Sequence, residues 1–171
     1  AVYDARPIPG AANVNLRYVY VPDNAVKSTA VWRLTFDPST EKMVADPLGG
    51  AFATAMLPLA DVRTLKPNGM ALGPDGNLYV TDLTELNIRK ITGINGDPRS
   101  QLISIVAQTG DLRGANGTAG FLGNRLYISE NRGTSFFDIS QCPMANGSPC
   151  GTIKIPLQAP PAGVFVAGTA V

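Results

Sequence analysis

Polar side chains that carry oxygen atoms recur at the ends of two similar segments of the chain. Asn68 stands near the start of the first segment and Asp82 ends it, while Asn116 and Glu130 occupy the corresponding positions 48 residues later. Carboxylate and amide oxygens are the ligands that a hard cation such as Ca²⁺ prefers. The same residue types also favour turns, because their side chains bond the local backbone. A calcium site is therefore one interpretation of this pattern, and a purely structural role is the other.

Two cysteines, Cys142 and Cys150, are separated by seven residues, all but one of which are proline, glycine, or small or polar types. Such a segment can bend back and bring its ends together, which predicts a local disulfide and an oxidising compartment. The alternative is a pair of reduced thiols. A zinc site is disfavoured, because the chain contains no histidine to complete a set of four ligands.

Composition excludes several classes of function. Without histidine the chain has no Ser-His-Asp triad and no imidazole base. The net charge of +1 and the lack of a basic run give nucleic acid no foothold. No apolar stretch approaches the roughly 20 residues of a membrane helix. Only 16% of residues are charged, which together with the expected disulfide favours a secreted or periplasmic protein. Asn116 and Asn146 each begin an Asn-x-Ser/Thr triplet, and whether either is glycosylated is left open.

The elements that would position these residues are short strands. The clearest unit spans 67–109, where strands are predicted over 69–72, 78–81, 88–92 and 102–107. Gly73-Pro74-Asp75-Gly76 separates the first two strands, with proline where φ is preset and glycine where φ is often positive. Four short strands with turns between them indicate an antiparallel meander.

A second unit spans about 115–158 and repeats this pattern. Strands are predicted over 117–122, 125–129, 135–140 and 152–157, and the offset of 48 aligns Ile88 with Phe136. The cysteine loop then falls between the third and fourth strands, at the outer edge of the unit. The same offset predicts the first strand of a further unit over 163–171.

The pattern is looser before residue 67, where one more unit is expected over about 1–60. Strands are predicted over 18–23, 30–36 and 43–45, and the Ala-rich connection over 49–66 has room for a short helical turn. No other helix is expected, because no long segment holds a 3.6-residue period.

Four-stranded units of this length, repeated around an axis, form a β-propeller. The sequence therefore predicts an all-β propeller segment of about three blades and one extra strand. A closed propeller needs four to eight blades. We expect the remaining blades of a six-bladed or similar ring to come from more of the same chain, with another copy or another protein as alternatives. Because strands one and two of a blade are antiparallel, Asn68 and Asp82 would share one rim, with Asp23 there in the preceding blade.

Residues 67–92, from Pro67-Asn68-Gly69 to the strand ending at Thr92, resemble a blade of the NHL-repeat propellers and of the related gluconolactonase (senescence-marker-protein-30) propellers. Residues 116–140 extend the resemblance in degenerate form. In the lactonase branch a divalent cation, often calcium, lies at the mouth of the central channel. One of its ligands is the asparagine of a Ser/Pro-Asn-Gly motif, and the resemblance carries this role over to Asn68 alone.

Three functions follow as hypotheses. The first is a secreted NHL-type propeller that acts as a protein- or ligand-binding scaffold, with partners on the rim that holds Asn68. The second is a calcium-dependent lactonase-like hydrolase, in which the metal would polarise the ester carbonyl. The third is a structural subunit of an extracellular assembly. Several aromatic residues are expected to pack between blades, namely Tyr18, Tyr20, Trp32, Tyr79, Phe136 and Phe137.

Overall fold

A computed structural model of the chain describes residues 1–23, 30–48, 53–55, 67–82, 86–97, 101–108, 119–130, 133–142 and 146–155. These residues form three β-sheets, which we name sheets A, B and C, and one short 3₁₀ helix. The described part of the chain contains no α-helix, so the prediction of an all-β protein is confirmed.

Sheet A comes from the N-terminal part of the chain. Its order is β1-β2-β3-β4 with antiparallel neighbours, and β5 pairs with β3 beside β4. Together β4 and β5 occupy the place of a fourth strand, with residues 45–52 between them. The strands are β1 (Val2–Asp4), β2 (Arg17–Asp23), β3 (Ala30–Asp37), β4 (Lys42–Val44) and β5 (Ala53–Ala55).

Sheet B is an antiparallel meander with one added parallel strand at its edge. Its hairpin turn is closed by the Gly76 amide, which donates to the Gly73 carbonyl at 2.9 Å, and Gly76 has the positive φ of +78° that favours glycine. The strands are β6 (Pro67–Leu72), β7 (Leu78–Asp82), β8 (Asn87–Thr92), β9 (Leu102–Gln108) and the parallel β13 (Cys150–Gly151).

Sheet C is a four-stranded antiparallel sheet in the order β10-β11-β12-β14. The 3₁₀ helix η1 (Ile139–Gln141) follows β12, and the side chain of Asp138 caps it by accepting from the Ser140 amide. The strands are β10 (Ala119–Leu122), β11 (Arg125–Glu130), β12 (Gly133–Asp138) and β14 (Ile153–Ile155).

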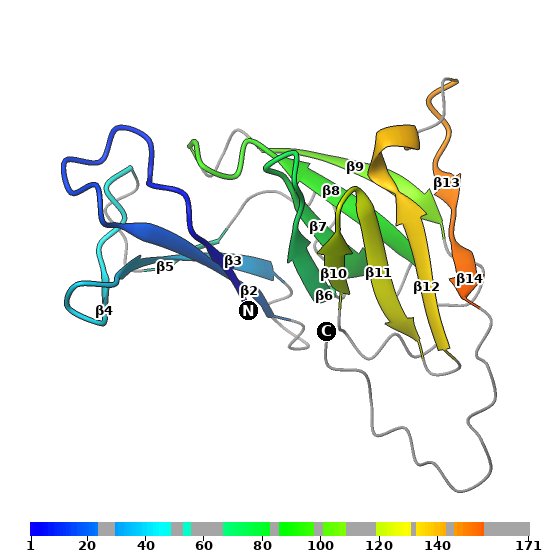
Figure 1. The fold of residues 1–171 in the computed structure, drawn as a ribbon. Helices are drawn as coiled ribbons and strands as arrows, with labels where there is room; N and C mark the ends of the chain where they lie inside the picture. Colours follow the sequence, from blue (N-terminus) through cyan, green and yellow to red (C-terminus); the bar gives the residue numbers. More distant parts are fainter. Residues whose placement is uncertain are drawn as a thin grey trace, which may run out of the picture.

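The three sheets lie in series, with sheet B between sheets A and C (Figure 1). Strand side chains alternate between two faces, and each face of sheet B packs on a different neighbour. Tyr20 of sheet A and Val80 of sheet B belong to one buried cluster, while Tyr79 of sheet B and Phe137 of sheet C belong to the other. Each pair of adjacent sheets therefore shares its own apolar core.

The first strands of the three sheets come together. β6 contacts β1 and β2 of sheet A and also contacts β10 of sheet C. Over the described residues the sheets do not close into a barrel or a complete propeller, so the prediction of a propeller is not confirmed by the fold alone.

Several sequence predictions need correction. The third strand of sheet C ends at Asp138 rather than residue 140, because η1 begins at Ile139. Residues 53–55, placed in a connection with room for a helical turn, form strand β5, and β1 was not predicted. Phe136 pairs with Tyr127 as Lys90 pairs with Tyr79, so it corresponds to Lys90 and not to Ile88. The strand expected over 163–171 lies outside the described residues.

Candidate functional site

Asn68 and Asp82 lie at the same end of sheet B, as the sequence predicts. Pro67 pairs with Asp82, and the register then shifts before Met70, so Asn68 and Gly69 occupy a β-bulge. The hydroxyl of buried Thr81 accepts from the Gly69 amide at 2.8 Å and donates to the Gly69 carbonyl at 3.3 Å. Thr81 thus provides hydrogen-bond partners for the Gly69 backbone groups at the bulge, and this fixes the backbone next to half-buried Asn68.

Asp82 forms a buried ion pair at this end of the sheet. Its Oδ2 atom lies 3.1 Å from Nη2 of Arg89, a contact that is an ion pair rather than an aligned hydrogen bond. The carboxylate faces sheet A, because Asp82 lies two residues beyond Val80 on the same strand face. Within the described structure, Oδ1 of buried neighbouring Asn87 and Nε of Arg89 have no hydrogen-bond partner. Buried polar atoms in this state are uncommon and costly.

Sheet A repeats this arrangement with a different donor. Asp23 ends β2 as Asp82 ends β7, and Nε1 of Trp32 donates to Oδ2 of Asp23 at 3.2 Å. Trp32 and Arg89 occupy the same position in register, since they lie opposite Val21 and Val80. The end of the second strand therefore holds an aspartate fixed by a donor from the third strand in both sheets.

Neither residue was predicted as the donor to an aspartate, and Trp32 was expected to pack between blades. The signal was available in the strand pairing, because the residue two positions after the cross-strand partner of the aspartate shares its face. Register must be known before that position can be read, and the lengths of the hairpin loops differ between units.

The other predicted ligands at this end are not placed. Asn116 lies outside the described residues. Glu130 ends β11, and its backbone pairs with that of Gly133. Among the described residues no group of three or more Asp, Glu, Cys or His side chains could hold a metal ion.

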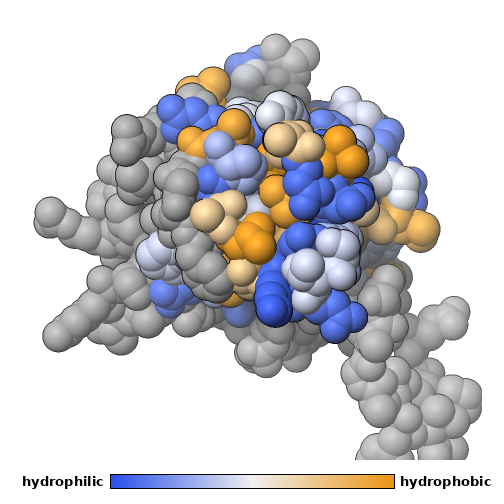
Figure 2. Space-filling model, turned by 90° about the vertical axis from the view of Figure 1, so that its left-hand side faces the viewer, coloured by the Kyte–Doolittle hydropathy of each residue, from blue (hydrophilic) through white to orange (hydrophobic). Residues whose placement is uncertain are grey.

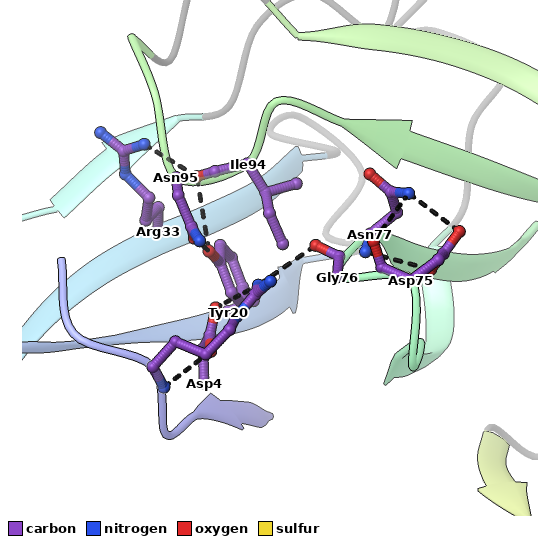
Figure 3. A network of polar contacts seen from close by, with 9 residues as sticks. Asp4, Tyr20, Arg33, Asp75, Gly76, Asn77, Ile94 and Asn95 are labelled. Carbon is purple, nitrogen blue, oxygen red and sulfur yellow. Dashed lines mark hydrogen bonds and ion pairs between the residues drawn. The ribbon is translucent and has the colours of Figure 1, made fainter. Parts of the chain in front are cut away.

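The opposite end of sheets A and B holds a network of hydrogen bonds and ion pairs (Figure 3). Buried Asp4 accepts from Nε and Nη2 of Arg6 at 2.8 and 2.7 Å, and Nη2 also donates to the Gly76 carbonyl at 3.1 Å. The hydrogen bond from Arg6 to Asp4 raises the pKa of Arg6 despite partial burial. This pair fastens β1 to the β6–β7 turn.

Arg33 makes the second link between the same sheets. It is fully buried, and Nε and Nη2 donate to Oδ2 of Asp46 at 3.1 and 2.8 Å. Nη1 donates to the carbonyls of Ile94 and Gly96 in the β8–β9 turn at 3.0 and 2.6 Å, as Figure 3 shows for Ile94. The guanidinium lies 4.3 Å from the ring centroid of Tyr18. Burial raises the pKa of Tyr18, so its hydroxyl remains protonated.

Asp75 organises the β6–β7 turn. Its Oδ2 atom lies 2.8 Å from Nζ of Lys90 and accepts from the Tyr79 hydroxyl at 2.8 Å. Burial opposes ionisation, but the hydrogen bonds from Lys90, Asn77 and Tyr79 outweigh it and lower the pKa of Asp75 to about 2. These polar groups are occupied with holding turns together, which leaves the Asn68 and Asp82 end as the candidate site.

The predicted disulfide between Cys142 and Cys150 is present. It closes the loop between η1 and β13, and β13 pairs in parallel with β9 of sheet B through Cys150 and Ala107. By sequence the cysteine loop belongs to sheet C, but β13 at its end lies along the edge of sheet B, which the sequence did not predict. This pairing protects an edge strand that would otherwise expose unpaired backbone groups.

Comparison with protein-family models and with curated proteins returned no match for this chain. The resemblance of residues 67–92 to NHL-type propellers therefore stays a prediction. No helix in the described part of the chain is long and apolar enough to cross a membrane. The disulfide fits an oxidising compartment.

Proposed function

We propose that this chain is a secreted NHL-type β-propeller segment that acts as a binding scaffold. Three meanders stacked through their faces, with first strands β1, β6 and β10 in contact along the series, support the propeller arrangement. The disulfide supports a secreted or periplasmic location.

The observation that carries the binding role is the repeated aspartate at the end of the second strand. Asp82, fixed by Arg89, is 0% exposed and supports the rim from within, whereas Asp23, fixed by Trp32 at the equivalent end of the neighbouring sheet, is half-buried and can be reached by a partner. Fixed groups cost less ordering entropy on binding than mobile ones. Asn68 adds an amide on the bulge beside Asp82. A partner with hydrogen-bond donors, such as a protein loop, fits this rim.

The alternative is a calcium-dependent lactonase-like hydrolase with Asn68 as one ligand. The adjacency of Asn68 and Asp82 supports it, because both supply oxygen. The Arg89 guanidinium argues against it, since that cation already neutralises the Asp82 carboxylate where a metal would need it. The scaffold is therefore the better-supported function. A structural subunit of an extracellular assembly is the third candidate, and the apolar outer faces described below bear on it.

Selection of binders from a displayed peptide library on the immobilised chain tests the scaffold. The selected peptides should lose binding to Asn68→Ala and Asp23→Asn but keep it with Asp37→Asn, a matched acid at the far end of sheet A. Binders that tolerate both rim substitutions would contradict the proposed site. A rise in melting temperature with Ca²⁺ that disappears in Asn68→Ala, together with lactone hydrolysis, would replace the scaffold by the hydrolase.

A further inference from the structure

Sheet A and sheet C each have one outer face, the face turned away from sheet B. These two outer faces carry residues equivalent to those that pack between sheets A and B and between sheets B and C. Tyr20, Tyr79 and Tyr127 occupy one position in sheets A, B and C, opposite Arg33, Lys90 and Phe136 of the third strand. Tyr20 and Tyr79 are buried against the next sheet, whereas Tyr127 is half-buried on the outer face of sheet C. The position that packs between sheets at Tyr20 and Tyr79 is thus also a tyrosine in sheet C, where no described sheet covers it.

Sheet A carries the matching half of the same interface on its own outer face. Leu78, Val80 and Ile91 of sheet B face the preceding sheet and are at most 1% exposed. Their counterparts in register on sheet A are Val19, Val21 and Leu34, which are only half-buried. The three counterparts on sheet C are likewise at most 1% exposed, namely Leu126, Ile128 and Phe137.

The ring contacts of Tyr79 indicate which side chains would pack against Tyr127. The Tyr79 ring meets Phe121 at 5.1 Å and Phe137 at 6.4 Å between centroids. In sheet A the positions of Phe121 and Phe137 are held by Tyr3, paired with Val19, and by Leu34. Tyr3 is 50% exposed. Figure 2 shows apolar residues among polar ones on the side of the molecule where sheet A lies.

We propose that the outer face of sheet A binds the outer face of sheet C of a second copy of this chain, with Tyr127 of one copy against Tyr3 and Leu34 of the other. The outer faces of sheets A and C are the two complementary surfaces of one interface, and both are on the same chain. A second copy can therefore cover each of them with the matching face. The proposal rests on the propeller arrangement proposed above. The described sheets of two copies joined head to tail at both faces number six, within the range of four to eight blades for closed propellers.

Sedimentation equilibrium of the 171-residue chain tests the interface. The expected mass is that of two chains of 17.9 kDa. Tyr3→Asp and Tyr127→Asp should each weaken dimerisation at least roughly 30-fold, because each places a charge at the centre of an apolar contact. Leu102→Asp is the matched control: Leu102 is 73% exposed but belongs to sheet B, which has no outer face, so this variant should dimerise like the wild type.

The direction of the interface gives a second test. A mixture of Tyr3→Asp and Tyr127→Asp retains one intact face of each kind, so dimer should reappear in the mixture. Both variants should keep the far-ultraviolet spectrum and melting behaviour of the monomer, since neither residue is in the two buried cores.

A monomeric wild-type chain at all concentrations would overturn the proposal, and so would a mixture that stays monomeric. A dimer that tolerates Tyr3→Asp would place the interface elsewhere. These outcomes are separate from the scaffold function, because Asn68→Ala removes rim binding without changing the mass.

Discussion

Arg33 and Asp46 form an ion pair that is buried on both sides, with Nη2 2.8 Å from Oδ2. Asp46 lies in the segment between β4 and β5, where the outer strand of sheet A is interrupted. The interruption allows the carboxylate to turn inward beneath Tyr18, which donates to it at 3.2 Å. A break in the outer strand is therefore linked to the contact between sheets A and B.

Arg33→Met should destabilise the protein by about 3–5 kcal/mol, because it leaves the Asp46 carboxylate buried without its counter-ion. The free energy of unfolding in urea measures this. Lys90→Met is the control, since Lys90 and Asp75 are 26% and 29% exposed and their pair should contribute about 1 kcal/mol or less. The double variant Arg33→Met/Asp46→Leu should recover much of the loss. Equal costs for Arg33→Met and Lys90→Met would contradict the role given to burial.

Gly73→Ala should destabilise the β6–β7 hairpin. A Cβ atom at this position would stand 2.6 Å from Cε2 of Tyr79, a ring that is locked between sheets B and C. Such overpacking typically costs about 1–3 kcal/mol. Gly120→Ala is the matched control, because a Cβ there meets nothing within 4 Å, and it should be neutral or slightly stabilising. Urea unfolding of both variants decides the point, and similar effects would show that close packing against Tyr79 is not the cause.

Local sequence signals were enough to predict the strands of sheet B. Alternating apolar residues and the Gly73–Gly76 turn specify β6 and β7 within one or two residues, because both signals act between neighbours in sequence. Strand β1 was missed because only three residues form it and its pairing with β2 is set by the sheet. Strand β13 was missed for a related reason, since its partner β9 belongs to another unit.

The candidate site could be predicted only in part. The shared position of Asn68 and Asp82 follows from antiparallel pairing, which the sequence indicates. The ion pair with Arg89 depends on which residue of β8 lies beside Asp82, and loop length sets that register. Arg33 was predicted only as part of the strand over 30–36, with no role of its own. Arg33 lies on the same strand face as Val31, which packs against sheet B. The face on which a residue lies therefore determines its burial here more than its own polarity does.

Replacing both cysteines, Cys142 and Cys150, by alanine should destabilise the protein by roughly 2–3 kcal/mol, the chain-entropy value for a loop of this length. The effect should be strongest where β13 pairs with β9. Hydrogen exchange should become faster at the amides of Ala107 and Gln108, while Val80 in the middle of sheet B should keep its protection. Unchanged exchange in β9 would show that the β13 pairing does not depend on the disulfide.

Acid should weaken the fold in the range where Asp75 loses its charge. Its pKa is lowered from 3.8 to about 2 in the folded protein, so its contribution is complete above about pH 4 and is lost as the pH falls towards 2. The contribution should be roughly 1 kcal/mol, less than the shift alone implies, because solvent screens this exposed turn.

Hydrogen bonds from Ser39 and Ser140 lower the pKa values of Asp37 and Asp138, which act in the same direction. Lys90→Met removes the strongest group that lowers the pKa of Asp75, so a carboxyl ¹³C titration should then find that pKa closer to 3.8. Unfolding measured across this pH range should lose part of its acid dependence in Lys90→Met. An unchanged Asp75 titration in that variant would show that Asn77 and Tyr79 hold the carboxylate without the lysine.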